Sequence, residues 1–193
     1  MMAESQYAEW YIDAAWIVWV VVWMALSLRV KKTVRHEGIL SRALHLGPLL
    51  LAGLLLFDRR FAFGVLATPV LARAAWMVFA GAATVTAGRT FAGWARLAIG
   101  ANWSGTVTVK QEHVLIDTGP YALARHPIYT GVLIALAGNA VANDNWAGVL
   151  AVVIVTVSFL RKMRTEEGFM IDTFGERYQQ YKLRTAKLMP FVW

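Results

Sequence analysis

Cysteine is absent from this sequence of 193 residues, and charged residues make up only 16% of it. Without cysteine the chain can form no disulfide, no thiolate nucleophile and no cysteine metal site. The sequence also lacks a GxGxxG segment after a strand pattern and an HExxH pair. These absences argue against an ordinary dinucleotide fold and a zinc hydrolase. No Gly-, Ser- or Pro-rich linker divides the chain, so we expect a single domain.

Hydrophobic residues make up 58% of the chain, and nine of its residues are tryptophan. A soluble domain has an apolar share nearer one half, so the composition predicts a membrane protein. The apolar residues concentrate in five uncharged runs of fifteen or sixteen residues, with a weaker run at Phe61–Ala72: Ala14–Leu28, Ala43–Phe57, Ala74–Gly88, Ile128–Asn143 and Asn145–Leu160. A span needs about 20 residues, so flanking Trp and Arg side chains are expected to extend these runs at the membrane interface. The predicted fold is an all-α integral membrane protein with about five transmembrane helices.

Basic residues are unevenly distributed around these runs. Sixteen of the nineteen Lys and Arg fall in three blocks, Arg29–Arg42, Arg89–Arg125 and Arg161–Lys187. This pattern predicts that the three blocks are cytoplasmic, with the N-terminus outside and the C-terminus inside. The net charge of +7 is then explained by contact with anionic lipid headgroups rather than with nucleic acid. No Lys or Arg precedes Arg29, so we expect the first run to remain in the mature protein.

The four residues ANDN at 142–145 separate the last two runs. So short a connection predicts a helical hairpin. The hairpin would bring Arg125–Tyr129 and Lys162–Glu167 to the same membrane face, although they are far apart in sequence.

The tail after the last run has an apolar stripe. Met170, Phe174, Tyr178 and Tyr181 are spaced by four, four and three residues. This spacing predicts one amphipathic C-terminal helix. It would lie on the membrane surface or pack against the preceding loop.

Several polar residues at this face are candidates for chemistry. His126 precedes Pro127, so it is expected to end a loop while Pro127 begins a helix. Arg125 and His126 would then lie at the positive end of a helix dipole, where an anion is favoured. Glu166 and Glu167 follow an apolar run, where carboxylates are costly unless paired or functional. Headgroup anchoring and structural ion pairs are the alternative explanations.

The two polar segments together resemble a known family. The run ARLAIGANWSGTVTVKQEHVLIDTGPYALARHPIYTG, followed by EEGFMIDTFGERYQQY, is similar to the isoprenylcysteine carboxyl methyltransferases and their bacterial relatives. The resemblance covers Phe91–Pro190. It implies a multi-span membrane enzyme that binds S-adenosylmethionine between the last hairpin, the preceding loop and the tail. Residues 1–193 would form a single membrane domain, with spans in 1–90 and the cofactor-binding catalytic region in 91–193.

The resemblance also implies roles for individual residues. An arginine that the family carries four residues before its first glutamate is Lys162 here, so Arg161 or Arg164 could supply the bidentate contact that lysine lacks. The implied catalytic residues are His126, Lys162 and Arg164, and no metal is implied. The implied cofactor contacts are His113, Val114, Leu115, Ile116, Tyr121, His126, Pro127, Ile128, Tyr129, Glu166 and Glu167.

The predicted function is therefore methylation of a lipophilic acceptor reached from the membrane, most concretely the carboxylate of an isoprenylcysteine-like group. Methyl transfer needs alignment and exclusion of water rather than a metal or a catalytic triad. The alternatives are a phospholipid amine or thiol methyltransferase, an NADPH-dependent membrane reductase similar to sterol reductases, and a non-catalytic carrier. Ionisable residues should line the spans of a carrier, and only Asp13 and His45 do so clearly. The expected location is a bacterial inner membrane.

Overall fold

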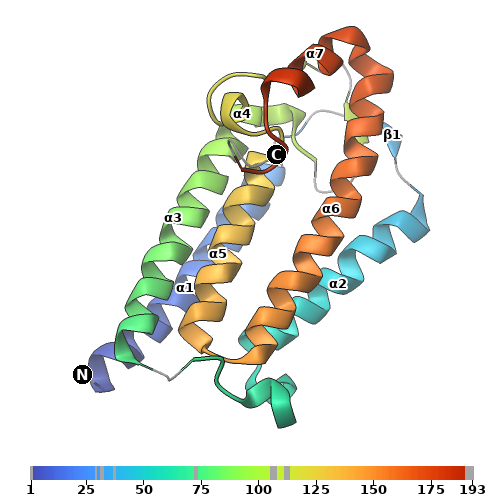
Figure 1. The fold of residues 1–193 in the computed structure, drawn as a ribbon. Coiled ribbons are helices and arrows are strands. Elements are labelled where there is room, and N and C mark those ends of the chain that lie inside the picture. Colours follow the sequence, from blue (N-terminus) through green and yellow to red (C-terminus); the bar gives the residue numbers. More distant parts are fainter. Residues whose placement is uncertain are drawn as a thin grey trace.

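The computed structural model describes residues 2–28, 30, 33–36, 38–71, 74–104, 108–110 and 114–189. In this part of the chain, five long helices form a bundle (Figure 1): α1 (Met2–Ser27), α2 (Ile39–Phe57), α3 (Ala75–Ile99), α5 (Pro127–Asn143) and α6 (Trp146–Phe174). The shorter elements are α4 (Pro120–Leu123), α7 (Glu176–Arg184), the strands β1 (Thr33–His36) and β2 (Thr108–Lys110), and the 3-10 turns η1 (Arg59–Phe61), η2 (Gly64–Ala67) and η3 (Gly100–Asn102).

Each of the five expected apolar runs lies in one of the long helices except for the end residues Leu28, Ala74 and Asn145, and each helix extends past its run. They are 26, 19, 25, 17 and 29 residues long in chain order. Among the described residues, three helical segments are long and apolar enough to cross a membrane, namely Gln6–Ser27, α2 and α6. The α5 helix is apolar but shorter, while α3 continues through Arg89 and Arg96.

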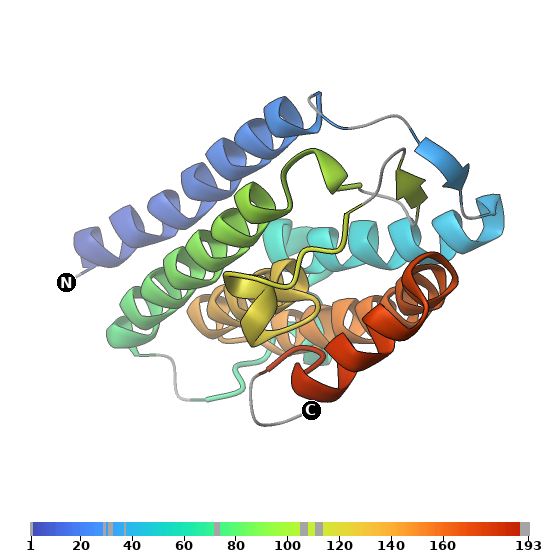
Figure 2. The ribbon, with the colours of Figure 1, turned by 90° about the horizontal axis from the view of Figure 1, so that it is seen from above.

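The long helices follow a simple spatial order. The α3 helix packs between α1 and α5, and α6 packs between α5 and α2. Figure 2 shows α1 beside α3 at the edge of the bundle. Many large apolar side chains on α1, such as Ile17, Val21 and Met24, are exposed, which suits contact with lipid.

Four glycines allow α3 and α5 to approach closely. Gly81 on α3 faces Gly138 on α5, and Gly88 faces Gly131. The two glycines on each helix are seven residues apart. A methyl group added to Gly88 would lie 2.5 Å from the backbone oxygen of Gly131, and one added to Gly131 would lie 2.5 Å from that of Gly88. Small residues that permit backbone contact are a common means of helix association in membranes.

Gly88→Ala is therefore expected to destabilise the protein by about 1–3 kcal/mol, because the added methyl group meets backbone atoms that cannot move independently. Gly93→Ala is the matched control, since Gly93 lies on the same helix with no atom within 4 Å of its added methyl. That change should be neutral or stabilising by up to about 1 kcal/mol, because alanine favours helix. Thermal unfolding in detergent compares the two, and equal midpoints would contradict the close approach.

The predicted hairpin between the last two runs is confirmed. The α5 helix ends at Asn143, Asp144 adopts a left-handed conformation with φ 43°, and α6 begins at Trp146. The Asn145 side chain caps α6 by accepting a hydrogen bond from the Gly148 amide at 2.8 Å. These features make a turn short enough to keep the two helices adjacent.

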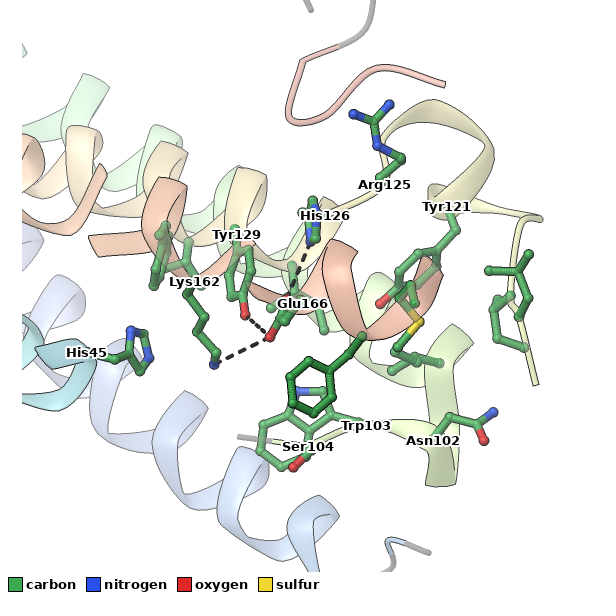
Figure 3. A pocket seen from close by; sticks show the side chains of 18 of the residues that line it. His45, Asn102, Trp103, Ser104, Tyr121, Arg125, His126, Tyr129, Lys162 and Glu166 are labelled. Carbon is green, nitrogen blue, oxygen red and sulfur yellow. Dashed lines mark hydrogen bonds and ion pairs between the residues drawn. The ribbon is translucent and has the colours of Figure 1, made fainter. Parts of the chain in front are cut away.

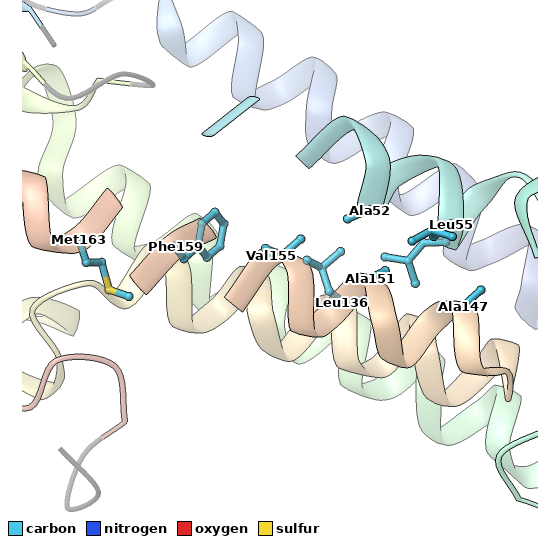
Figure 4. Packing of buried hydrophobic residues seen from close by; sticks show 9 residues of the cluster. Ala52, Leu55, Leu136, Ala147, Ala151, Val155, Phe159 and Met163 are labelled. Carbon is cyan, nitrogen blue, oxygen red and sulfur yellow. The ribbon is translucent and has the colours of Figure 1, made fainter. Parts of the chain in front are cut away.

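The principal apolar core joins α2, α5 and α6 (Figure 4). On α6 the buried residues recur every four positions along one stripe, and they meet residues of α2 and α5: Ala52, Leu55, Leu56, Leu136, Ala147, Ala151, Val155, Phe159 and Met163. Glu167 continues this stripe by one more turn and is also buried. A charged residue therefore lies at the end of an otherwise apolar contact surface.

The prediction of one amphipathic helix for the tail is wrong. The α6 helix ends at Phe174, and Gly175 with φ 51° breaks the chain direction before α7 begins at Glu176. Glycine adopts this positive φ without the steric penalty of a side chain. The apolar stripe nevertheless gathers in one place, because Tyr178 and Tyr181 form a small core with Leu115, against which Met170 and Phe174 pack.

Two short strands were not predicted. β1 pairs antiparallel with β2, with His36 opposite Thr108. This pairing connects the segment after α1 with the segment after α3 at the end of the bundle where α5 begins.

Candidate active site

A cavity of about 450 Å³ lies between the start of α5 and the last turns of α6. Residues of α1, α2, α5, α6 and α7, and of the segments on either side of β2, contribute to its lining (Figure 3). Nine of the thirteen residues to which the family resemblance gives a role line it: Val114, Leu115, Ile116, Tyr121, His126, Ile128, Tyr129, Lys162 and Glu166. Arg125, also a candidate from the sequence, lines it too.

The other residues singled out from the sequence are placed differently. Pro127 is fully buried at the first position of α5, as expected, and does not line the cavity. Glu167 is buried and borders a separate, more open depression beside α7. Arg164 is exposed and away from the cavity. His113 lies outside the described residues.

Glu166 is the carboxylate that faces the cavity. The Tyr129 hydroxyl donates a hydrogen bond to its Oε1 at 2.7 Å. Lys162 Nζ lies 3.7 Å from the same oxygen, as expected for residues four apart on a helix, and His126 Nδ1 lies 3.6 Å from Oε2. Figure 3 shows these three side chains converging on Glu166. The carboxylate is thus surrounded by donors that come from both helices of the hairpin.

Glu167 is the centre of a second group of charges. Arg125 Nε donates to its Oε1 at 2.9 Å, and His126 Nε2 lies 3.4 Å from the same oxygen. Lys182 and Lys187 lie 3.5 and 3.6 Å from Oε2. The adjacent glutamates therefore have different surroundings, one in the cavity wall and one in an ion-pair cluster.

The chain after α7 is fastened to the loop before α5. The Arg125 amide donates to the Ala186 oxygen at 2.8 Å, and the His126 amide donates to the Lys187 oxygen at 3.1 Å. The Thr130 hydroxyl donates to the Leu188 oxygen at 2.6 Å. The Arg125 guanidinium also donates to the backbone oxygens of Lys182 and Thr185. These bonds hold the tail over the start of α5.

His126 lies between the two glutamates, and its ring stacks on Tyr129 at 5.6 Å between centroids. Burial would by itself lower the pKa of His126, but hydrogen bonding to Glu166 and Glu167 and their negative charges outweigh burial and raise it. The protonated imidazole is thereby favoured.

This shift predicts a pH dependence of stability. Because the folded pKa of His126 exceeds its ordinary value of 6.5, its contribution is fully present below about pH 6.5 and is lost as pH rises through the folded pKa. The difference in unfolding midpoint between wild type and His126→Asn should therefore be largest below about pH 6.5 and shrink as the pH is raised above it. A difference that stays constant as the pH rises, measured in detergent, would contradict a charged His126.

Several lining residues had not been predicted to belong to a site. Trp19 and Trp23 of α1 line the cavity. Trp16 of the same helix instead packs between helices, and its Nε1 donates to Asn139 at 3.1 Å. His45 of α2 and Trp103 also line the cavity. Apart from their residue types, no local sequence signal marks them.

Buried Arg96 positions one part of this aromatic wall. Its guanidinium lies 4.5 Å from the centre of the Trp103 ring and donates to the Leu26 oxygen at 2.7 Å. Trp103 also meets Trp23 edge to face at 5.6 Å. Arg96 therefore connects the end of α1 to the segment after α3.

The cavity combines two chemical surfaces. Glu166, Lys162 and His126 provide charge at one side, while aromatic and aliphatic residues cover much of the rest. Its volume is within the range of small-molecule sites. Such a lining suits a ligand that carries charged groups on a partly apolar body.

Comparison with known proteins places this arrangement in a family. The model of the family described as phospholipid methyltransferase matches residues 76–177. Protein-S-isoprenylcysteine O-methyltransferase B of Arabidopsis thaliana is 26% identical over 81% of this chain and 86% of its own length. The protein-S-isoprenylcysteine O-methyltransferase of Rattus norvegicus is 32% identical over 64% of this chain and 45% of its own length. The chain spans about half the length of most of its curated relatives.

The fold has a counterpart among solved structures. The eukaryotic intramembrane Ras methyltransferase, an isoprenylcysteine carboxyl methyltransferase, matches with a TM-score of 0.53 and 20% identity, over 82% of this chain and 55% of that chain. The fold is thus that of an all-α integral membrane protein. The chain belongs to the phospholipid methyltransferase family, and the resemblance to isoprenylcysteine carboxyl methyltransferases is confirmed.

Proposed function

We propose that the protein transfers a methyl group from S-adenosylmethionine to a lipophilic acceptor, most concretely to the carboxylate of an isoprenylcysteine-like molecule. The observation that carries this proposal is the cavity itself. The two segments on which the family resemblance rests both border it, and seventeen of their residues line this one space of about 450 Å³.

The residues of the cavity fit the cofactor. S-adenosylmethionine supplies an electrophilic methyl group on a sulfonium centre. The Glu166 carboxylate suits the ammonium or hydroxyl groups of such a ligand. Aromatic faces such as those of Tyr121, Tyr129 and Trp103 suit a cationic sulfonium. Glu167 is enclosed by cations, so we assign it to holding the tail in place rather than to cofactor contact.

Lys162 is the residue that we assign to the acceptor carboxylate. It is buried at the cavity, whereas Arg164 is exposed and Arg161 donates to the backbone oxygen of Ser41 at 3.2 Å. A carboxylate is already ionised at neutral pH and needs no general base. Lys162 and His126 would hold the acceptor, while the apolar walls exclude water from the reacting atoms.

The apolar part of the cavity suits a lipid tail. Leu46 and Leu49 of α2, Val132 of α5 and Phe159 of α6 line it. Three of the helices that border the cavity are long and apolar enough to span a membrane, so an acceptor dissolved in the bilayer could enter between them.

Amine methylation is the second candidate, because the matching family is described by phospholipid methylation. The cations Lys162 and His126 at the cavity favour an anionic acceptor over an amine that is protonated before it reacts. The choice of acceptor therefore tests the assignment of Lys162.

The experiment uses the purified protein in detergent with labelled S-adenosylmethionine. We expect saturable binding of S-adenosylmethionine. We also expect its labelled methyl group to be transferred to the carboxylate of S-farnesylcysteine analogues in preference to phosphatidylethanolamine. Binding of NADPH without binding of S-adenosylmethionine would overturn the proposal and favour a reductase. Transfer of label to phosphatidylethanolamine alone would instead support the second candidate, an amine methyltransferase.

We further propose five spans, with the site facing the cytoplasm of a bacterial inner membrane, because the three basic blocks lie at the end of the bundle that holds the site. The absence of cysteine permits a clean test. A cysteine introduced at exposed Gln180 should be protected from an impermeant thiol reagent in intact cells, and one at exposed Val65 should react. The reverse pattern would overturn the orientation.

A further inference from the structure

An unpaired amide lies in the cavity wall at Asn102. This residue is the last of η3, and it lines the cavity. Within the part of the chain that the structure describes, its side-chain oxygen Oδ1 is buried and has no hydrogen-bonding partner. Burying a polar atom without a partner costs free energy. A ligand that donates a hydrogen bond to this oxygen would remove that cost.

The backbone around Asn102 is held in place, whereas its amide is not. Arg96 donates to the Gly100 oxygen at 2.9 Å, and the Trp103 amide donates to the same oxygen at 3.3 Å. The Trp103 ring in turn packs on the Arg96 guanidinium. The last side-chain torsion of asparagine is soft, and no hydrogen bond within the described residues restrains Oδ1. Rotation about this torsion can therefore turn the oxygen toward a ligand without breaking a bond.

Asn102 lies away from the residues assigned to the acceptor. Figure 3 shows Asn102 and Tyr121 on one side of Glu166, and Lys162 and His45 on the other. The acceptor carboxylate is assigned to Lys162, so the transferred methyl group must face that side. The rest of the cofactor then extends from Glu166 toward Asn102.

The cavity wall near Tyr121 is aromatic and apolar. The Tyr181 hydroxyl donates to the Tyr121 backbone oxygen at 2.6 Å, and the Tyr181 ring packs with Leu115 and Tyr178. All four residues line the cavity. A flat heteroaromatic ring with an uncharged polar edge suits such walls. The adenine base of S-adenosylmethionine is such a ring, while the charged groups of the cofactor lie at its other end.

We propose that Asn102 recognises the adenine base of S-adenosylmethionine, with Oδ1 accepting from the 6-amino group and Nδ2 donating to an adjacent ring nitrogen. An amide donates and accepts side by side, which matches the edge of adenine. Asn102 is then a specificity residue that selects a 6-aminopurine and takes no part in methyl transfer. This inference rests on the proposed function, since it takes S-adenosylmethionine as the methyl donor.

The test measures binding without turnover. Purified protein in detergent is titrated with S-adenosylhomocysteine and with the analogue in which hydrogen replaces the 6-amino group. We expect the wild type to bind the 6-amino compound about tenfold or more tightly, because a site that hydrogen-bonds an N–H group discriminates against a ligand that lacks it. Asn102→Leu and the smaller change Asn102→Ala should both reduce this ratio to about one.

Asn143→Leu is the matched control. The Asn143 amide donates to the Leu56 oxygen at 2.9 Å and does not line the cavity. Its removal should lower the unfolding midpoint and preserve the ratio of affinities. If the Asn102 amide were only structural, its variants would behave in the same way as this control.

Equal binding of the two compounds by the wild type would overturn the inference and leave the proposed function standing. A preference for the 6-amino compound that survives both Asn102→Leu and Asn102→Ala would do the same, because another residue would then read the base. Absence of S-adenosylhomocysteine binding by the wild type would instead overturn the proposed function, and this inference with it.

Discussion

Glu166→Gln is expected to weaken the binding of S-adenosylmethionine about 100-fold. The change preserves the shape of the side chain but removes the charge that Lys162, His126 and Tyr129 surround. A cationic ligand would then meet two cations without the carboxylate that offsets them. Truncating one partner of a buried charged pair costs about 2–5 kcal/mol in binding, and 100-fold corresponds to about 2.7 kcal/mol.

Equilibrium binding of labelled S-adenosylmethionine to the detergent-purified variant measures this loss. Tyr129→Phe is an informative companion, because it removes only the hydroxyl that donates to Glu166 at 2.7 Å, and it should cost about tenfold or less. The assignment would be wrong if Glu166→Gln bound S-adenosylmethionine with unchanged affinity while a fully folded Glu167→Gln variant bound it much more weakly. Glu167 would then be the cofactor-binding glutamate.

The helical framework could be predicted because its signals are local. Uncharged runs mark the five long helices, and Pro127 marks the start of α5. The ANDN turn marks the hairpin, because Asp144 tolerates the left-handed conformation and Asn145 caps the next helix. These signals were sufficient to place Tyr129 and Glu166 in one site.

The ends of the helices were harder to predict, because charges interrupt the apolar runs. The last run ended at Leu160 by composition, yet α6 continues to Phe174. Its charges are tolerated because Lys162 pairs with Glu166, and Arg125 pairs with Glu167. Hydropathy averaged over a window detects neither pair, because it counts each charge by itself and because Arg125 is distant in sequence from Glu167.

The parts of the site that come from α1 and α2 could not be predicted. Trp23 and His45 line the cavity, but each is a single residue in an apolar helix with no motif around it. Their position depends on how α1 packs against α3 and how α2 packs against α6. The difference between Glu166 and Glu167 is also tertiary, since adjacent residues on a helix point in directions about 100° apart.

Glu167→Gln is expected to destabilise the fold by about 3 kcal/mol, because it leaves the buried Arg125 guanidinium without its carboxylate. Arg125 and Glu167 are 9% and 8% exposed, whereas Lys182 is 34% exposed and can be solvated in its place. The loss should therefore arise chiefly from Arg125. Because Arg125 also binds the backbone of the tail, the residues after α7 should detach first.

Thermal unfolding should show a midpoint lower by roughly 6–12 °C for a chain of this size. Exposed Glu176 at the start of α7 provides the matched control, and Glu176→Gln should change the midpoint by little. Hydrogen exchange should increase at the Arg125 and His126 amides, which donate to the tail, in Glu167→Gln, while the core of α6 stays protected. A midpoint within 1–2 °C of wild type would mean that the cluster around Glu167 contributes no more than an exposed ion pair. The two glutamates are thus expected to differ in their effects: Glu166 governs ligand affinity because it faces the cavity, and Glu167 governs stability because it is the carboxylate that pairs with the buried Arg125 guanidinium.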